Sequence, residues 1–363
     1  MIHFKKNISA VLASMLMASS AFCFTSSAEK TPIWAGHVYG SNRLETSIKA
    51  SDYVQNTKML VVASGRNYSD SLSAYNIASK YNARLLLVGK NSNIKDEMRK
   101  HNLKKVFIVG GENIVGKRPI DTLKEGQREY HRNTQYKVLA GKNRYETNEI
   151  TLREGGFNKV GVADGRNFPD ALASFGLLRK HNLGLMLVKG NKPYTTNRTV
   201  VYTFGGPSSV ITDGGKRIYG KNRYETCDVI NREVKDVSVT AITSGKHFAD
   251  ALSSINLVIG YKNASLLLVD SPKISLDKKK LVRNAKVNYV VGGTIDKDIQ
   301  NRINRRFAGE IPGDKIPDKK DEKAVKKSSK VLYKENDENR NPSDKYLNAE
   351  SEINISEEVI QNK

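Results

Sequence analysis

The chain has 363 residues, enough for two or three domains of ordinary size, with 38% hydrophobic residues and a formal net charge of +22. Its mean hydropathy of -0.52 excludes a chain packed throughout, so we expect one part to lie outside any core. The positive charge favours a polyanionic partner, unless the basic surface serves solubility alone. The two cysteines exclude a disulfide-stapled domain, because Cys23 lies in a predicted leader and Cys227 is then the lone thiol.

The chain begins with the pattern of a secretory signal peptide over residues 1–28. Lys5 and Lys6 precede an apolar run over 8–24, and small residues end at Ala28. The run is short and rich in Ser and Ala for a spanning helix, so no transmembrane segment is expected after cleavage.

Four landmarks then occur in the same order three times, which indicates three copies of one unit. The first landmark is Gly40-Ser-Asn-Arg-Leu-Glu-Thr46, Gly141-Lys-Asn-Arg-Tyr-Glu-Thr147 and Gly220-Lys-Asn-Arg-Tyr-Glu-Thr226. The second begins at Ser64, Asp164 and Ser244, and contains Asn-Tyr-Ser-Asp70, Asn-Phe-Pro-Asp170 and His-Phe-Ala-Asp250. A Leu-rich run and a Gly-Gly pair follow in each copy. We expect repeats over 29–118, 136–212 and 216–309.

The first copy predicts helices that alternate with buried strands. Asn42 and Glu45 have the spacing of a helix cap and its reciprocal acid, which predicts a helix over 42–53. Apolar runs predict strands over 59–63, 85–88 and 106–109, with helices over 67–81 and 93–100 between them. Apolar strands that alternate with helices predict a parallel α/β sheet covered on both faces.

The second copy is shorter than the other two. Seventeen positions separate Val188 from Gly205, against 22 and 23 at the same place in the first and third copies. This gap predicts that the last helix of the second copy is missing or reduced to a turn. From residue 310 to 363 the chain has mixed charges and no apolar period, which predicts a disordered tail.

These four landmarks together resemble the clostridial cell-wall-binding repeat of the second type, which occurs in triplicate in S-layer-associated cell wall proteins. The resemblance covers roughly residues 36–305. It implies three Toprim-like parallel-sheet units in a pseudo-threefold arrangement, and binding of an anionic, phosphate-bearing wall polysaccharide. It also implies a secreted protein at the wall or surface of a Gram-positive bacterium, with S-layer or other surface proteins as further partners. The Leu-rich runs depart from the family pattern, since no Pro precedes them.

Six basic residues are the predicted polymer-binding set: Arg43, Arg144, Arg223, Arg66, Arg166 and Lys246. The first three open the first helix of each copy, where free backbone N–H groups and a guanidinium suit a phosphate. The alternative is that each pairs with a carboxylate of Asp70, Asp170 or Asp250 and locks the repeats together. The other three follow the first strand of each copy, where open α/β sheets bind ligands.

Neighbouring residues are assigned structural roles. Asn67 and Asn167 are interpreted as helix caps, with His247 a weaker cap, and Glu45, Glu146 and Glu225 as capping acids. Packing is preferred over sugar stacking for Tyr145 and Tyr224, because the first copy has Leu44 there.

No catalytic residues, metal site or cofactor are predicted. The His residues lack metal-ligand spacing, and Cys227 is interpreted as a buried structural thiol because its equivalents are Ser47 and Asn148. The alternatives to a binding protein are a wall hydrolase or amidase, which has no chain left to fold a catalytic domain, and a binder of nucleic acid or glycosaminoglycan. Export and the repeats argue against nucleic acid as partner.

Overall fold

The computed structural model describes residues 34–212, 214–261, 263–269, 285, 287–293 and 295. The predicted signal peptide and tail lie outside these residues. Among the described residues, no helix is both long and apolar enough to cross a membrane.

In the described part of the chain, twelve strands form three four-stranded sheets in which every neighbouring pair is parallel. The first sheet has the order β3 (Arg84–Val88), β2 (Met59–Ser64), β4 (Lys105–Val109) and β5 (Gln135–Leu139). The second has the order β7 (Gly184–Val188), β6 (Lys159–Asp164), β8 (Thr199–Phe204) and β9 (Lys216–Ile218). The third has the order β11 (Ala264–Val269), β10 (Val239–Ser244), β12 (Val287–Val291) and β1 (Trp34–Val38). The α/β prediction is therefore confirmed.

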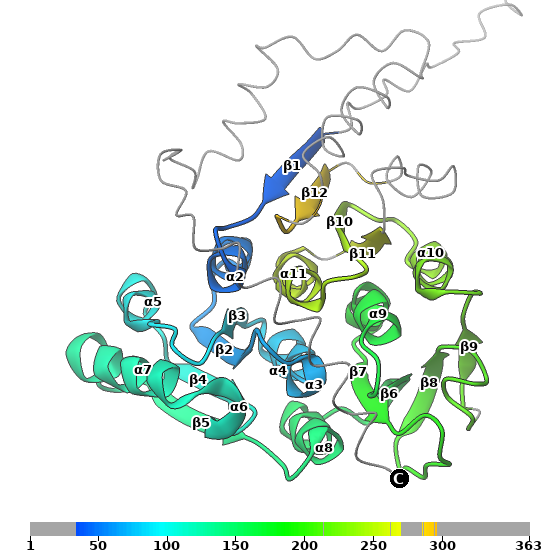
Figure 1. The fold of residues 1–363 in the computed structure, drawn as a ribbon, viewed down its shortest axis with the longest axis horizontal. Helices are drawn as coiled ribbons and strands as arrows, with labels where there is room; N and C mark the ends of the chain where they lie inside the picture. The colour runs from blue at the N-terminus through cyan, green and yellow to red at the C-terminus, as the bar shows by residue number, and fades with distance from the viewer. Residues whose placement is uncertain are drawn as a thin grey trace, which may run out of the picture. The chain divides into compact units, whose positions relative to one another are not determined.

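The helices connect these strands and cover the sheets (Figure 1). The first unit contains α2 (Arg43–Ser51), α3 (Tyr68–Ser71), α4 (Ala74–Tyr81), α5 (Lys95–Lys100), α6 (Glu112–Val115) and α7 (Lys117–Tyr130). The second contains α8 (Arg144–Gly155) and α9 (Pro169–Lys180), and the third contains α10 (Arg223–Glu233), α11 (Phe248–Ser253) and α12 (Ile255–Gly260). The predicted strands of the first copy agree with the structure to within a residue. The predicted helix over 67–81 is divided into α3 and α4.

The fourth strand of each sheet leads into the first helix of another repeat. β5 precedes the second Arg-Tyr-Glu-Thr helix but pairs with β4, and β9 precedes the third such helix but pairs with β8. β1, which precedes the first such helix, pairs with β12 of the third unit, with Trp34 opposite Val287 and Val38 opposite Val291. The three units therefore form a closed cycle, which the sequence pattern did not reveal.

One hydrophobic core joins the three units. The helices after the first strands meet there: Leu72, Leu172 and Leu252 are fully buried, and the rings of Tyr75 and Phe175 stack at 4.6 Å between centroids. Apolar residues spaced along these helices thus face each other across the pseudo-threefold axis.

Residues 189–198, all of which the structure describes, form no helix between β7 and β8, as the shorter sequence of the second unit predicted. Tyr194 and Val210 contribute to a small hydrophobic cluster in this unit. The equivalent region of the first unit has a larger cluster, to which Met98 of α5 and Leu123 of α7 contribute. The corresponding segment of the third unit lies outside the described residues. The helix α7, which packs against α5, was not predicted.

Candidate functional site

Each of the three helices that open a repeat begins with an arginine whose side chain reaches the end of a strand. The Nη1 atom donates a hydrogen bond to the carbonyl oxygen of the glycine that follows the first strand of the same unit. The donor–acceptor distances are 3.2 Å for Arg43–Gly65, 2.7 Å for Arg144–Gly165 and 2.8 Å for Arg223–Gly245. All three guanidinium groups are thereby fixed at the carboxyl ends of the sheets.

Each guanidinium also lies over an aromatic ring of the preceding unit. Arg144 is 5.6 Å from the ring centroid of Tyr68, Arg223 is 5.6 Å from that of Phe168, and Arg43 is 5.8 Å from that of Phe248. These separations are typical of cation–π contacts. The contacts are cyclic, since the third unit returns to the first.

The three rings contact one another on the pseudo-threefold axis. Their centroids are 5.5 Å apart for Tyr68–Phe168, 5.8 Å for Tyr68–Phe248 and 6.1 Å for Phe168–Phe248. Arg43 and Arg223 are exposed and Arg144 is partly exposed. We use the name arginine–aromatic ring for the set of six residues Arg43, Arg144, Arg223, Tyr68, Phe168 and Phe248. The aromatic members were not predicted, although an aromatic residue at the same motif position in each copy was a signal for them.

Aspartates from the second landmark lie beside this ring. Asp70 and Asp250 are each only 8% exposed. Burial raises the pKa of Asp70, and the charge of Arg144 opposes that shift. Burial likewise raises the pKa of Asp170 to about 6, against the charge of Arg223.

The arginines and aspartates interact across the units through their charges. Among the described residues, neither Arg144 with Asp70 nor Arg223 with Asp170 comes within 4.0 Å as an ion pair. The carboxylates of Asp70 and Asp170 therefore do not form ion pairs with these arginines. The guanidinium groups are held in place by the glycine carbonyls and by the aromatic rings.

The first turns of these helices are largely capped, so they offer an anion few free N–H groups. Asn143 Oδ1 accepts from the N–H groups of Tyr145 and Glu146 at 3.0 and 3.1 Å. Glu146 Oε2 accepts from the N–H of Lys142 at 2.9 Å. The other two helices have the same Asn cap and acid. An anion would meet a carboxylate there, so the guanidinium groups must supply the attraction.

The second basic set differs among the units. Arg166 forms an ion pair with the buried Asp164, with 2.8 Å between Nη2 and Oδ2. Ser64 and Ser244 take the place of this acid in the other two units, where Arg66 and Lys246 are exposed. The structure therefore places all three at strand ends, but neutralises Arg166.

The helix caps follow the predictions only in part. Asn67 Oδ1 accepts from the N–H of Ser69 at 2.8 Å, as expected. The cap assigned to Asn167 is wrong, because α9 begins after Phe168 without a side-chain cap. Pro169 opens that helix and has no N–H to be capped. His247 makes no cap hydrogen bond.

Two structural assignments are confirmed. Tyr145 and Tyr224 pack against the core, and a side chain at Gly165 or Gly245 would meet their rings. Cys227 is fully buried, and its Sγ accepts from the N–H of Leu268 at 3.2 Å. Its equivalents Ser47 and Asn148 accept from Leu87 and Leu187 in the same way.

The described residues contain no group of three or more His, Cys, Asp or Glu side chains that could hold a metal ion. The fold and the site thus define an α/β repeat protein with three pseudo-equivalent units and an arginine–aromatic ring on their axis.

The chain belongs to the cell wall binding domain 2 family, whose model matches residues 37–118, 138–213 and 217–299. The family assigns it a cell-wall-binding role, at the cell wall or cell surface.

Two curated relatives share this region. The chain is 24% identical over 297 residues to N-acetylmuramoyl-L-alanine amidase LytC of Bacillus subtilis (strain 168), covering 75% of this chain and 58% of the amidase. It is 27% identical over 289 residues to the amidase enhancer of the same organism, covering 74% of this chain and 40% of that protein. The chain therefore spans less than two thirds of either relative.

Two solved structures share the fold. Cwp6 from Clostridium difficile superposes with a TM-score of 0.65 at 20% identity, over 76% of this chain and 48% of Cwp6. Cwp8 from the same organism gives a TM-score of 0.62 at 19% identity, over 74% of this chain and 52% of Cwp8.

Proposed function

We propose that this protein attaches to the bacterial cell wall by binding an anionic, phosphate-bearing wall polysaccharide, and that the arginine–aromatic ring is the centre of its site. The observation that carries the proposal is the convergence of Arg43, Arg144 and Arg223 on one axis, each from a different unit. A guanidinium group can bind a phosphate through two parallel N–H donors.

The geometry of the ring favours an external anion. Among the described residues, each guanidinium donates one hydrogen bond, to a glycine carbonyl. Further N–H donors therefore remain on the exposed Arg43 and Arg223 and on the partly exposed Arg144. The aromatic rings hold the three cations close together without neutralising them. The net charge of +22 would also raise the local concentration of a polyanion.

The direct test replaces all three arginines of the ring with Gln and measures sedimentation of the secreted protein with purified walls. Each lost charge-assisted contact should weaken binding by roughly 1–3 kcal/mol. Walls stripped of the phosphate-bearing polymer should retain neither parent nor variant. Circular dichroism should check the fold, because each substitution also removes a glycine contact and a ring contact.

The matched control removes the same charge elsewhere, by replacing the exposed Arg99, Arg128 and Arg153 with Gln. If both triple variants lose affinity equally, the overall positive charge rather than the ring binds the polymer. If the ring variant binds walls as the parent does, the proposed site is wrong.

We also expect wall binding to weaken steeply as salt rises, because a cation that binds a linear polyanion releases condensed counterions. The ring variant should show a shallower salt dependence than the parent in the same sedimentation assay. Parent binding that does not change with salt would contradict an electrostatic mechanism.

A further inference from the structure

The two glycines of each Gly-Gly pair have different environments. The first glycine, Gly110, Gly205 or Gly292, is buried and has a positive φ between 94° and 107°. A Cβ at Gly205 would lie 2.9 Å from Asp170 Oδ2, and one at Gly292 would clash with Asp250 Oδ2. The fold therefore requires glycine at this first position.

The fold makes no such demand on the second glycine. None of Gly111, Gly206 and Gly293 has φ in the left-handed region. A Cβ at Gly111 would meet its nearest neighbour, Ala140 Cβ, at 3.9 Å, and one at Gly206 would meet Tyr219 at 3.4 Å. Both are ordinary van der Waals contacts. Gly111 also caps the short helix α6, but Ser or Asn would serve better there.

Glycine nevertheless occupies this second position in all three units, and it is at least partly exposed in each. Besides allowing unusual backbone angles, glycine lets a ligand approach the backbone closely. The second glycine also lies at the carboxyl edge of the sheet, where open α/β folds bind ligands.

Each second glycine follows the third strand of its unit, which lies between the first and fourth strands of the sheet. On one side is therefore the end of the first strand, which leads to Arg66, Arg166 or Lys246. On the other side is the residue after the fourth strand, whose Cβ or ring is the nearest neighbour of the glycine: Ala140, Tyr219 or Tyr39. Tyr219 is 49% exposed. Neighbouring strands are about 5 Å apart, so one sugar ring could reach both flanks.

We propose that the second glycine of each pair is the floor of a saccharide subsite, on which a sugar unit of the wall polymer lies flat against the backbone. Tyr219 in the second sheet stacks on that sugar through the apolar face of its ring. Tyr39 in the third sheet has the same position, but its ring also contacts His37 and Lys49. The first sheet has Ala140 instead and provides the weakest of the three subsites. This inference rests on the proposed function and extends the site outward from the arginine–aromatic ring.

The test replaces Gly111, Gly206 and Gly293 together with Ala, and in a second variant with Ser, which keeps a helix-capping side chain. Sedimentation with purified walls should become at least roughly tenfold weaker in both variants. The melting temperature should stay at or above that of the parent, since Ala in a permitted conformation restricts the unfolded chain. The control Gly205→Ala should lower the melting temperature, because Gly205 has a positive φ and lies against Asp170.

A gain-of-function variant tests the aromatic half of the proposal. Ala140→Tyr should strengthen wall binding, whereas Tyr219→Ala should weaken it and Tyr219→Phe should leave it nearly unchanged. Unaltered binding in both glycine variants would overturn the subsite. If the arginine variant alone loses binding, the proposed function survives without the subsite. If neither the arginine nor the glycine variants lose binding, both fail together.

Discussion

At the scale of single residues, the aspartates beside the arginine–aromatic ring lie in an environment that disfavours their charge. Asp170 is the extreme case, because burial raises its pKa to about 6 despite the nearby Arg223. The same carboxylate lies against Gly205, where the fold tolerates no side chain. The carboxylate of Asp170 is therefore closely packed against Gly205, while Arg223 compensates only part of the cost of burying its charge.

The raised pKa of Asp170 predicts that the protein becomes more stable as the pH falls from 7 toward 4. The folded form holds a proton between pH 6 and the ordinary value of 3.8, while the unfolded chain does not. The gain is at most roughly 3 kcal/mol in the free energy of unfolding, at about 1.4 kcal/mol per pKa unit. Asp170→Asn should remove it.

Denaturant unfolding of parent and Asp170→Asn between pH 4 and 7 measures this difference. Comparing the two chains cancels other titrating groups, such as His101, whose pKa is lowered by burial. Parallel pH profiles for the two proteins would show that Asp170 ionises normally.

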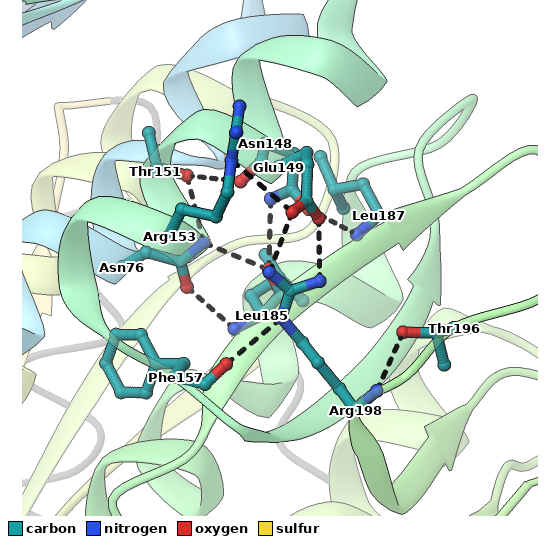
Figure 2. A network of polar contacts seen from close by, with 10 residues as sticks. All are labelled: Asn76, Asn148, Glu149, Thr151, Arg153, Phe157, Leu185, Leu187, Thr196 and Arg198. Carbon is teal, nitrogen blue, oxygen red and sulfur yellow. Dashed lines mark hydrogen bonds and ion pairs between the residues drawn. The ribbon is translucent and has the colours of Figure 1, made fainter.

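At the scale of elements, edge strands are completed by side chains instead of by a further strand (Figure 2). The N–H of Leu185 in β7 donates to Asn76 Oδ1 at 2.7 Å, and its carbonyl accepts from Asn76 Nδ2 at 3.0 Å. Asn148 bonds the same carbonyl and the N–H of Leu187. Since Asn76 lies on α4 of the first unit, these bonds also join two units. Asn256 bonds Leu85 of β3 in the equivalent way.

We expect Asn76→Ala to lower the free energy of unfolding by roughly 2–4 kcal/mol, because it strands a buried N–H and weakens the bonding of a buried carbonyl. Chemical denaturation measures the loss. The control Asn113→Ala changes an exposed residue on α6 and should have almost no effect. Equal stability of the two variants would mean that the Asn76 contacts contribute nothing net.

At the scale of the whole molecule, the closed cycle depends on β1. His37 Nε2 bonds the carbonyl of Gly292 at 2.9 Å, and Val38 is 2% exposed. Without β1, β12 would present an unpaired edge, and the first repeat would contribute no strand to the third sheet.

A chain that starts at Tyr39 should therefore melt at a lower temperature than one that starts at Ile33. Burial of Val38 alone contributes roughly 1.5–3 kcal/mol, and five paired residues would be lost with it. Differential scanning calorimetry of the two chains measures the effect. Identical melting curves would show that β1 is not part of the cooperative fold.

The sequence alone predicted the three units, their parallel α/β character and the missing helix of the second unit. These depend on local patterns: apolar runs, capping residues and glycine stops act over a few neighbouring positions. The basic residues at Arg43, Arg144 and Arg223 were also recognisable, because the same type recurs in each copy.

Only the tertiary structure decided how those residues combine. The pairing of β1 with β12, the stacking of Arg144 on Tyr68, and the placement of Asp170 near Arg223 all join different repeats. The recurring aromatic position shows that Tyr68, Phe168 and Phe248 are equivalent, but only packing in three dimensions decides which residues of different units meet. For the same reason, the difference between the two glycines of each pair became visible only when their neighbours were in place.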